Sequence, residues 1–182
     1  MNDEKLKWET KGEEELLSTR VFRVIKRREL SPTGVIGDYI ALDGPDCVVV
    51  IPETEGAFVT VRQWRHGSGT LTVEFPGGVV DRGEEPETAA RRELEEETGC
   101  IPGKLTFLGE CSPNPALFTS RLYFYLAEEL TPTGATHPDP DELIETALVP
   151  TEEFIASFGN AEVTHAFTGT ALTLYLRHKA GK

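Results

Sequence analysis

The sequence predicts an α+β fold in which a mixed β-sheet is flanked by helices. Segments of strand length dominate the chain, and only a few helical segments are interspersed among them. Hydrophobic residues make up 38% and charged residues 27% of the 182 residues, which is typical of a folded globular protein. A chain of this length can bury a sizeable core, so one compact domain is the simplest expectation.

The predicted strands are separated by turns rich in glycine and proline. Alternation of apolar and polar residues predicts a strand at residues 21–29, and a second short strand follows at 38–42. A valine-rich run at 47–51 predicts a buried strand, which a turn at Glu55-Gly56 joins to a hairpin partner at 57–63. The remaining strands are expected at residues 71–75, 105–108, 122–127 and 144–149.

One helix has clear signals at both ends, and it is predicted over Pro86–Thr98. Proline suits the first turn, Glu87 complements the positive end of the helix dipole, and Gly99 is a favourable stop. Two further helices are expected at about residues 151–158 and 164–178.

The net charge narrows the classes of partner. The chain has 31 Asp and Glu against 18 Lys and Arg, a net charge of −13, which argues against nucleic-acid polymers and anionic membranes. The charged N-terminal residues are unlike a secretory signal, and no apolar run is long enough to span a membrane. The three cysteines and four histidines lack metal-site spacing, so we expect a cytoplasmic protein without a zinc site.

More than a third of the net charge is concentrated in residues 78–100. On a helix, Glu93, Glu96 and Glu97 stand at positions i, i+3 and i+4, so their carboxylates share one face. Like charges at this spacing destabilise a helix unless a counter-charge is present, and carboxylate oxygens suit Mg²⁺ or Mn²⁺. For these three residues alone, a solvated acidic face is the alternative.

The wider spacing resembles the Nudix box, G-x5-E-x7-R-E-U-x-E-E-x-G-U, in which U is an apolar residue. A chance match is on the order of one in a million or rarer, because each fixed residue type has a usage of about 6–7%. The resemblance implies a Nudix hydrolase with an α/β/α sandwich, and the segments VRQWRHG and LTVEFPGG are similar to the ADP-ribose pyrophosphatase branch. The matching residues are Gly78, Glu84, Arg92, Glu93, Glu96, Glu97 and Gly99, with Cys100 at the last apolar position.

The resemblance implies a catalytic metal site on the helix. Glu93, Glu96 and Glu97 would bind Mg²⁺, with Mn²⁺ as a substitute, and the carbonyl of Gly77 would be a further ligand. Arg92 would orient one of these glutamates, although alone it could form an ordinary ion pair with Glu96. Glu84 would brace the turn before the helix. Glu93, Glu97 and Arg92 are therefore expected to be catalytic.

The resemblance also implies substrate contacts. Arg65 would contact a phosphate or a neighbouring carboxylate, and Glu74 would contact substrate, metal-bound water or Arg65. Pro115 corresponds to a proline that marks enzymes acting on ADP-ribose or related nucleoside diphosphate sugars. The residues from Ala116 to Ser120 lack the glycine and glutamate of the usual Pro-Gly-x-Ser-x-Glu pattern, so the identity of the sugar stays open.

A general base is expected in the acidic loop at residues 137–145, as in similar proteins. Glu142 matches best, and Asp139, Asp141 and Glu145 are alternatives.

The implied organisation is an N-terminal β extension at residues 1–45, followed by a Nudix hydrolase domain at 46–182. The extension is similar to strands through which ADP-ribose-type members form homodimers that complete each pocket. Phe22 or Tyr39 would stack on a base there, although each could instead be an ordinary packing residue.

Together these expectations describe Mg-dependent hydrolysis of ADP-ribose, or a related nucleoside diphosphate sugar, to a nucleoside monophosphate and a sugar phosphate. One alternative is a Nudix enzyme that acts on a dinucleoside polyphosphate or an oxidised nucleotide. The other is a non-catalytic, nucleotide-binding regulatory module.

Overall fold

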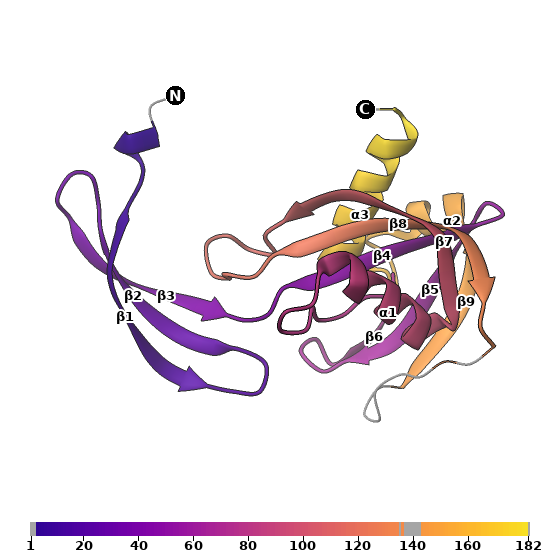
Figure 1. The fold of residues 1–182 in the computed structure, drawn as a ribbon, viewed down its shortest axis with the longest axis horizontal. Coiled ribbons are helices and arrows are strands. Elements are labelled where there is room, and N and C mark those ends of the chain that lie inside the picture. Colours follow the sequence, from indigo (N-terminus) through magenta and orange to yellow (C-terminus); the bar gives the residue numbers. More distant parts are fainter. Residues whose placement is uncertain (1–2, 135, 137–142, 182) are drawn as a thin grey trace. The chain divides into compact units, whose positions relative to one another are not determined.

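The computed structural model describes residues 3–134, 136 and 143–181 (Figure 1). The chain divides into two compact units. One comprises Met1–Pro45 together with Ser112–Arg121, and the other comprises Asp46–Cys111 together with Leu122–Lys182. The first unit therefore combines the N-terminal residues with a loop from the middle of the chain.

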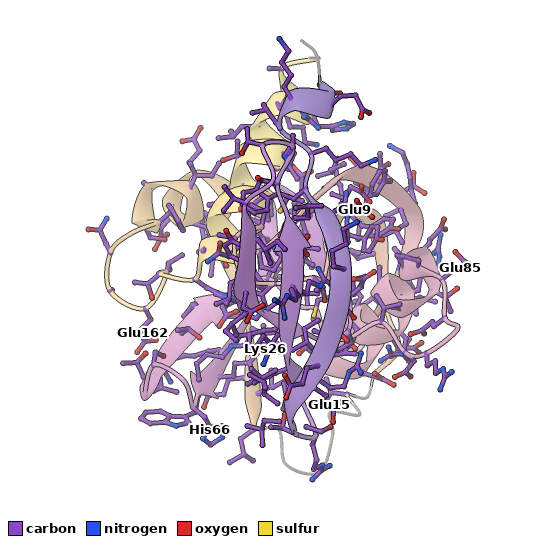
Figure 2. All side chains as sticks on the ribbon, turned by 90° about the vertical axis from the view of Figure 1, so that its left-hand side faces the viewer. Glu9, Glu15, Lys26, His66, Glu85 and Glu162 are labelled. Carbon is purple, nitrogen blue, oxygen red and sulfur yellow. The ribbon has the colours of Figure 1, made fainter. Side chains whose placement is uncertain are left out.

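The first unit is an antiparallel sheet with strand order β1-β2-β3. Its first strand is absent from the prediction, because all ten of its side chains are exposed and no apolar alternation marks it. Ion pairs join it to the second strand: Arg27 contacts Glu13 at 2.7 Å, and Lys26, which is labelled in Figure 2, contacts Glu14. The elements of this unit are the 3-10 helix η1 (Asp3–Lys5), β1 (Glu9–Ser18), β2 (Arg23–Leu30) and β3 (Ile36–Asp43).

The second unit is built on a mixed sheet of six strands. Its order is β6-β5-β4-β8-β7, and β9 pairs with β5. The β4–β8 pair is parallel, whereas the other pairs are antiparallel. The strands are β4 (Cys47–Thr54), β5 (Ala57–Arg65), β6 (Thr70–Glu74), β7 (Cys100–Cys111), β8 (Leu122–Pro132) and β9 (Ile144–Pro150).

Helices cover both faces of this sheet, namely α1 (Pro86–Thr98), α2 (Thr151–Ser157) and α3 (Ala166–Lys179) (Figure 1). Successive side chains of β4 point to opposite faces. Val48 and Val50 pack against Leu94 of α1, whereas Val49 and Ile51 belong to the core that includes residues of α2 and α3. This arrangement confirms the predicted α/β/α sandwich.

The bounds of α1 agree with those predicted from its end signals. Gly99 adopts a left-handed φ of 65°, and its N–H donates to the carbonyl of Glu95 at 2.8 Å. The last two helices differ from prediction by one or two residues at their ends. No described helix is both long and apolar enough to cross a membrane.

Candidate active site

Arg92 is the centre of an ion-pair network on α1. Its Nε and Nη2 donate to the two oxygens of Glu84 at 3.1 and 2.9 Å. Its Nη1 donates to Glu93 at 2.8 Å and to Glu96 at 3.1 Å. The hydrogen bond with Glu84 is the main cause that raises the pKa of Arg92, and it lowers the pKa of Glu84. Arg92 thus supplies counter-charge to the acidic face and ties the helix to the preceding loop.

The backbone of Gly77 and Gly78 lies against two predicted metal ligands. The side chain of Glu97, which is 4% exposed, accepts a hydrogen bond from the N–H of Gly77 at 3.0 Å. A Cβ on Gly78 would lie 2.5 Å from Cδ of Glu93, and one on Gly77 would overlap the carbonyl of Val48. Glycine is required at both positions for this close approach. One loop therefore contacts the carboxylates of Glu93 and Glu97.

The three glutamates fit a divalent cation by their chemistry. Within the described part of the chain, no three acidic, histidine or cysteine side chains are already gathered closely enough to hold a metal ion. Glu93 and Glu96 are instead held by Arg92. The donor set nevertheless consists of three hard carboxylate ligands on one helix face, one of them almost fully buried. A buried carboxylate is stabilised by a nearby positive charge, so the chemistry of this face fits a divalent cation.

A second charged cluster surrounds Glu74, the last residue of β6, which is 2% exposed. Nε and Nη2 of Arg65 donate to its two oxygens, each at 2.8 Å. The hydroxyl of Thr72 and Nδ1 of His165 also contact its carboxylate. Burial acts to raise the pKa of Glu74, but the hydrogen bonds from Arg65, His165 and Thr72 outweigh it and hold the pKa well below its usual range. Glu74 is therefore a buried anion.

The backbone before α1 connects the two clusters. Glu74 lies three residues before Gly77, whose N–H donates to Glu97 of α1. The Arg65–Glu74 pair is therefore close along the chain to the loop that contacts the predicted metal ligands. Burial raises the pKa of Cys47 at the start of β4, and the charges of Asp46 and Glu93 raise it further, whereas the charge of Arg65 lowers it.

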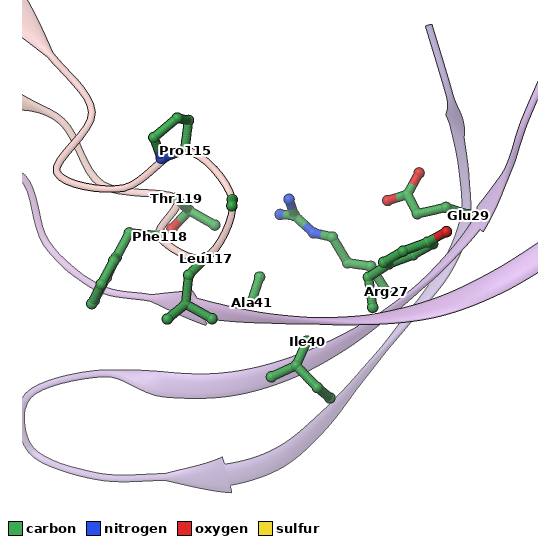
Figure 3. A pocket seen from close by; sticks show the side chains of 10 residues that line it. Arg27, Glu29, Ile40, Ala41, Pro115, Leu117, Phe118 and Thr119 are labelled. Carbon is green, nitrogen blue, oxygen red and sulfur yellow. The ribbon is translucent and has the colours of Figure 1, made fainter. Parts of the chain in front are cut away.

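The first unit contains a pocket of about 500 Å³ (Figure 3). Arg27 and Glu29 of β2 line it together with Tyr39 of β3 and Pro115 of the 112–121 loop. Arg27 and Tyr39 are direct cross-strand neighbours. The pocket thus combines a cation, a carboxylate, an aromatic ring and an apolar loop.

The 112–121 loop is fixed to β3 by backbone and side-chain contacts. The N–H of Leu42 donates to the carbonyl of Leu117 at 2.8 Å, and the N–H of Thr119 donates to the carbonyl of Leu42 at 3.1 Å. The hydroxyl of Thr119 donates to Asp43 at 2.7 Å, and Arg23 contacts the same carboxylate. These hydrogen bonds hold the pKa of Asp43 below its usual range. The wall of the pocket is therefore anchored to the sheet.

Comparison with known proteins assigns the family. The family model of the NUDIX domain matches residues 44–167. The chain is also 32% identical over 176 residues to an ADP-ribose pyrophosphatase of Bacillus subtilis (strain 168), an alignment that covers 96% of this chain and 95% of that protein. The chain belongs to the Nudix family and is a Nudix hydrolase.

Two further similarities agree with this assignment. The Nudix hydrolase is 31% identical over 98 residues to the ADP compounds hydrolase NudE of Escherichia coli (strain K12), which covers 54% of this chain and 53% of that protein. A crystal structure of an ADP compounds hydrolase matches with a TM-score of 0.86 and 25% identity, over 96% of this chain and 95% of that one. Nudix hydrolases generally use divalent metal ions, which agrees with the donor chemistry of α1.

The structure brings together several residues that the sequence had singled out separately. Arg65 contacts Glu74, which is one of the two partners expected for it. Tyr39 and Pro115 line one pocket, whereas Phe22 is not among the residues that line it. The roles of all these residues in substrate binding stay predictions.

Glu142, the predicted general base, lies outside the described residues, as do its alternatives Asp139 and Asp141. The remaining alternative, Glu145, is the second residue of β9, and its carboxylate contacts Arg62 at 3.3 Å. Its carboxylate is thus engaged in an ion pair.

Sequence reasoning did not identify His165 and Arg27 as site residues. His165 lies 91 residues from Glu74 in the chain, and no local motif connects the two. Arg27 lies in an alternating strand whose charged side chains look like a solvated face. Only the tertiary arrangement reveals their contacts.

Proposed function

We propose that this Nudix hydrolase cleaves the diphosphate linkage of ADP-ribose, or of a closely related nucleoside diphosphate sugar, giving a nucleoside monophosphate and a sugar phosphate. The observation that carries the reaction type is the placement of Glu93, Glu96 and Glu97 on one face of α1, where Arg92 contacts the first two. The similarity to an ADP-ribose pyrophosphatase over nearly the whole chain supports the substrate class.

We propose Mg²⁺ as the metal, with Mn²⁺ as a substitute, held by Glu93, Glu96 and Glu97 with the carbonyl of Gly77 as a further ligand. When bound, the cation supplies positive charge for the diphosphate and lowers the pKa of a water molecule. Arg92 holds the carboxylates of Glu93 and Glu96 at the same face of α1. The N–H of Gly77 orients the carboxylate of Glu97.

A carboxylate of the chain removes a proton from the water that attacks phosphorus. Glu142 remains the best candidate for this general base by its place in the sequence. Glu93 and Glu97 are catalytic in this proposal because they would hold the cation. Arg92 supports Glu93 directly and the preceding loop through Glu84.

The remaining binding groups suit an anionic nucleotide. The side chain of Arg65 is 42% exposed although one edge of its guanidinium is held by Glu74, so it can also meet a phosphate. In the pocket of the first unit, the ring of Tyr39 and the apolar ring of Pro115 suit a base, and Arg27 suits a negatively charged group.

We further propose that the enzyme is cytoplasmic and forms a homodimer. The structure describes all three cysteines and joins none of them in a disulfide, which is typical of a reducing compartment. The small-molecule substrate requires neither a nucleic-acid polymer nor a membrane as partner.

A substrate panel tests the proposed function. Purified protein with Mg²⁺ is incubated with ADP-ribose, other nucleoside diphosphate sugars, dinucleoside polyphosphates and oxidised nucleoside triphosphates, and the products are separated by chromatography. We expect AMP and ribose 5-phosphate from ADP-ribose. Release of pyrophosphate from a triphosphate as the main activity would overturn the proposal. Nucleotide binding without turnover of any compound would indicate a regulatory module.

A further inference from the structure

We infer that His165 is a positioning residue, which fixes Glu74 and thereby orients the guanidinium of Arg65 toward the phosphorylated substrate. The inference rests on the proposed function, because it takes Arg65 to be a residue that contacts a substrate phosphate. It assigns a role to a histidine outside the Nudix box and outside the segments VRQWRHG and LTVEFPGG.

Both carboxylate oxygens of Glu74 are held by hydrogen bonds. Its Oε1 accepts from Nε of Arg65 and from the hydroxyl of Thr72, and its Oε2 accepts from Nη2 of Arg65 and contacts Nδ1 of His165. An ionised carboxylate only accepts hydrogen bonds, so Nδ1 of His165 must carry the proton. Glu74 is 2% exposed, and its carboxylate contacts four nitrogen or hydroxyl atoms from three residues. Its orientation is thus determined from two sides.

The hydrogen-bond donors to Glu74 come from two parts of the second unit. Arg65 ends β5 and Thr72 lies on β6, so both belong to the same hairpin as Glu74. His165 stands at the N-cap of α3 and is, among the described residues, the one partner of this carboxylate from outside that hairpin. Without it, the Arg65–Glu74 pair would lose its connection to the rest of the second unit at this point.

The segment that carries His165 is held in place by hydrogen bonds and by a core residue. The N–H of Val73 donates to the carbonyl of Glu162 at 2.9 Å. Nε and Nη2 of Arg62 donate to the carboxylate of Glu162 at 2.7 and 3.0 Å. The next residue, Val163, is 7% exposed and belongs to the core. The segment before α3 is therefore tied to β5 and β6, and His165 acts from a fixed position.

This arrangement orients the guanidinium of Arg65. A bidentate pair with Glu74 fixes the plane of the guanidinium and leaves the side chain 42% exposed. Glu74, which holds the guanidinium, lies three residues before Gly77, whose N–H donates to Glu97 of the Nudix helix. A guanidinium that is already oriented loses less conformational entropy when it binds an anion. Removal of His165 should therefore weaken substrate binding.

A purely structural role for this cluster is the competing explanation. Buried charged groups are often no more stabilising than well-packed apolar residues, so an apolar replacement of His165 could preserve the fold. The two explanations differ in what they require: orientation of Arg65 needs a donor at the place of Nδ1, whereas packing needs only volume.

Three substitutions separate these explanations. Asn places its amide nitrogen near the position of Nδ1, Gln places it near Nε2, and Leu has no donor. We expect H165L to raise KM for ADP-ribose by about tenfold, as for one lost charge-assisted hydrogen bond, with kcat changed by less than about twofold. H165N should restore a KM near the wild-type value, and H165Q should not. The control H178L changes an exposed histidine of the same helix and should leave KM unchanged.

The NMR resonance of the Arg65 Nε–H group provides a readout that does not require turnover. We expect H165L to shift or broaden this resonance, and H165N to resemble the wild type. A KM for H165L within about twofold of wild type, equal impairment of H165N and H165L, or an unchanged Arg65 resonance in H165L would each overturn the inference. If the wild-type enzyme did not hydrolyse ADP-ribose, the proposed function would fail, and the Arg65 resonance would still decide the role of His165.

Discussion

Glu97 combines a negative charge with almost complete burial. Its side chain is 4% exposed and accepts a hydrogen bond from the N–H of Gly77, so its carboxylate is held against the loop before α1. Glu95, two positions earlier on the same helix, is exposed. Neutralising each residue in turn therefore distinguishes the effect of a charge on the predicted metal-binding face of α1 from the effect of the total charge of the helix.

We predict that Glu97→Gln lowers kcat/KM by roughly a hundredfold, because it removes a charged ligand from the face that holds the cation. Steady-state hydrolysis of ADP-ribose and calorimetric titration with Mn²⁺ measure the two effects. The variant should remain folded by circular dichroism, since Gln keeps an oxygen that can accept from Gly77.

The control is Glu95→Gln, which removes the same charge from the exposed part of α1 and should keep wild-type activity. Full activity of Glu97→Gln, or an equal loss in both variants, would contradict the metal assignment. If the three acidic residues had only a structural role, neutralising Glu97 would instead raise the melting temperature through relief of repulsion.

At the scale of elements, the loop before α1 is shaped by the close approach of its backbone to the helix. A Cβ at position 78 would lie 2.5 Å from Cδ of Glu93. We predict that Gly78→Ala displaces this carboxylate and lowers kcat by roughly tenfold to a hundredfold, because displacements of about 1 Å are costly in catalysis. Stability should change by less than about 1 kcal/mol, since the end of a flexible side chain can move.

The matched control is Gly12→Ala in β1, where an added Cβ meets no atom within 4 Å. ADP-ribose turnover and thermal unfolding are measured for both variants. An active Gly78→Ala enzyme would show that the position of Glu93 is not critical. A large loss of stability in this variant would indicate instead that the glycine serves the fold.

The elements with strong local signals are those that the sequence predicts best. Proline at position 86 and glycine at position 99 define the ends of α1, and the valine-rich run beginning at position 47 marks β4. The strand β1 lacks such a signal, because it is exposed along its whole length and pairs through charges rather than an apolar face. Its pairing depends on charged residues of β2, which lie opposite β1 only in the folded chain.

The candidate site divides in the same way. The Nudix box lies within 23 consecutive residues, so its spacing alone identifies Arg92 and its glutamates. The Glu74 cluster instead joins residues 91 positions apart, and its most distant member, His165, has no motif of its own. Contacts of this kind depend on the packing of α3 against the sheet, which periodicity does not reveal.

At the scale of the molecule, the first unit has little core of its own. Among its described apolar side chains, only Ile25 belongs to the buried core residues. A sheet of three strands normally needs a covering layer or a hydrophobic face to be stable. Its exposed apolar side chains include Leu6, Trp8, Leu16, Leu17, Val21, Val35, Ile36, Tyr39 and Ile40. Burial of such residues would be a favourable driving force for association.

We therefore predict a homodimer in which a second copy covers part of this sheet, with a mass about twice 20.1 kDa in size-exclusion chromatography with light scattering. Ile40 of β3 is 45% exposed, and it is one of the residues that line the pocket of the first unit (Figure 3). Ile40→Lys should shift the mass toward the monomer, because a buried lysine is costly at an apolar interface. Leu148→Lys, at a residue 65% exposed on β9, is the matched control and should leave the dimer intact. A wild-type protein that stays monomeric at micromolar concentration would exclude this assembly, and equal masses for both variants would place the interface elsewhere.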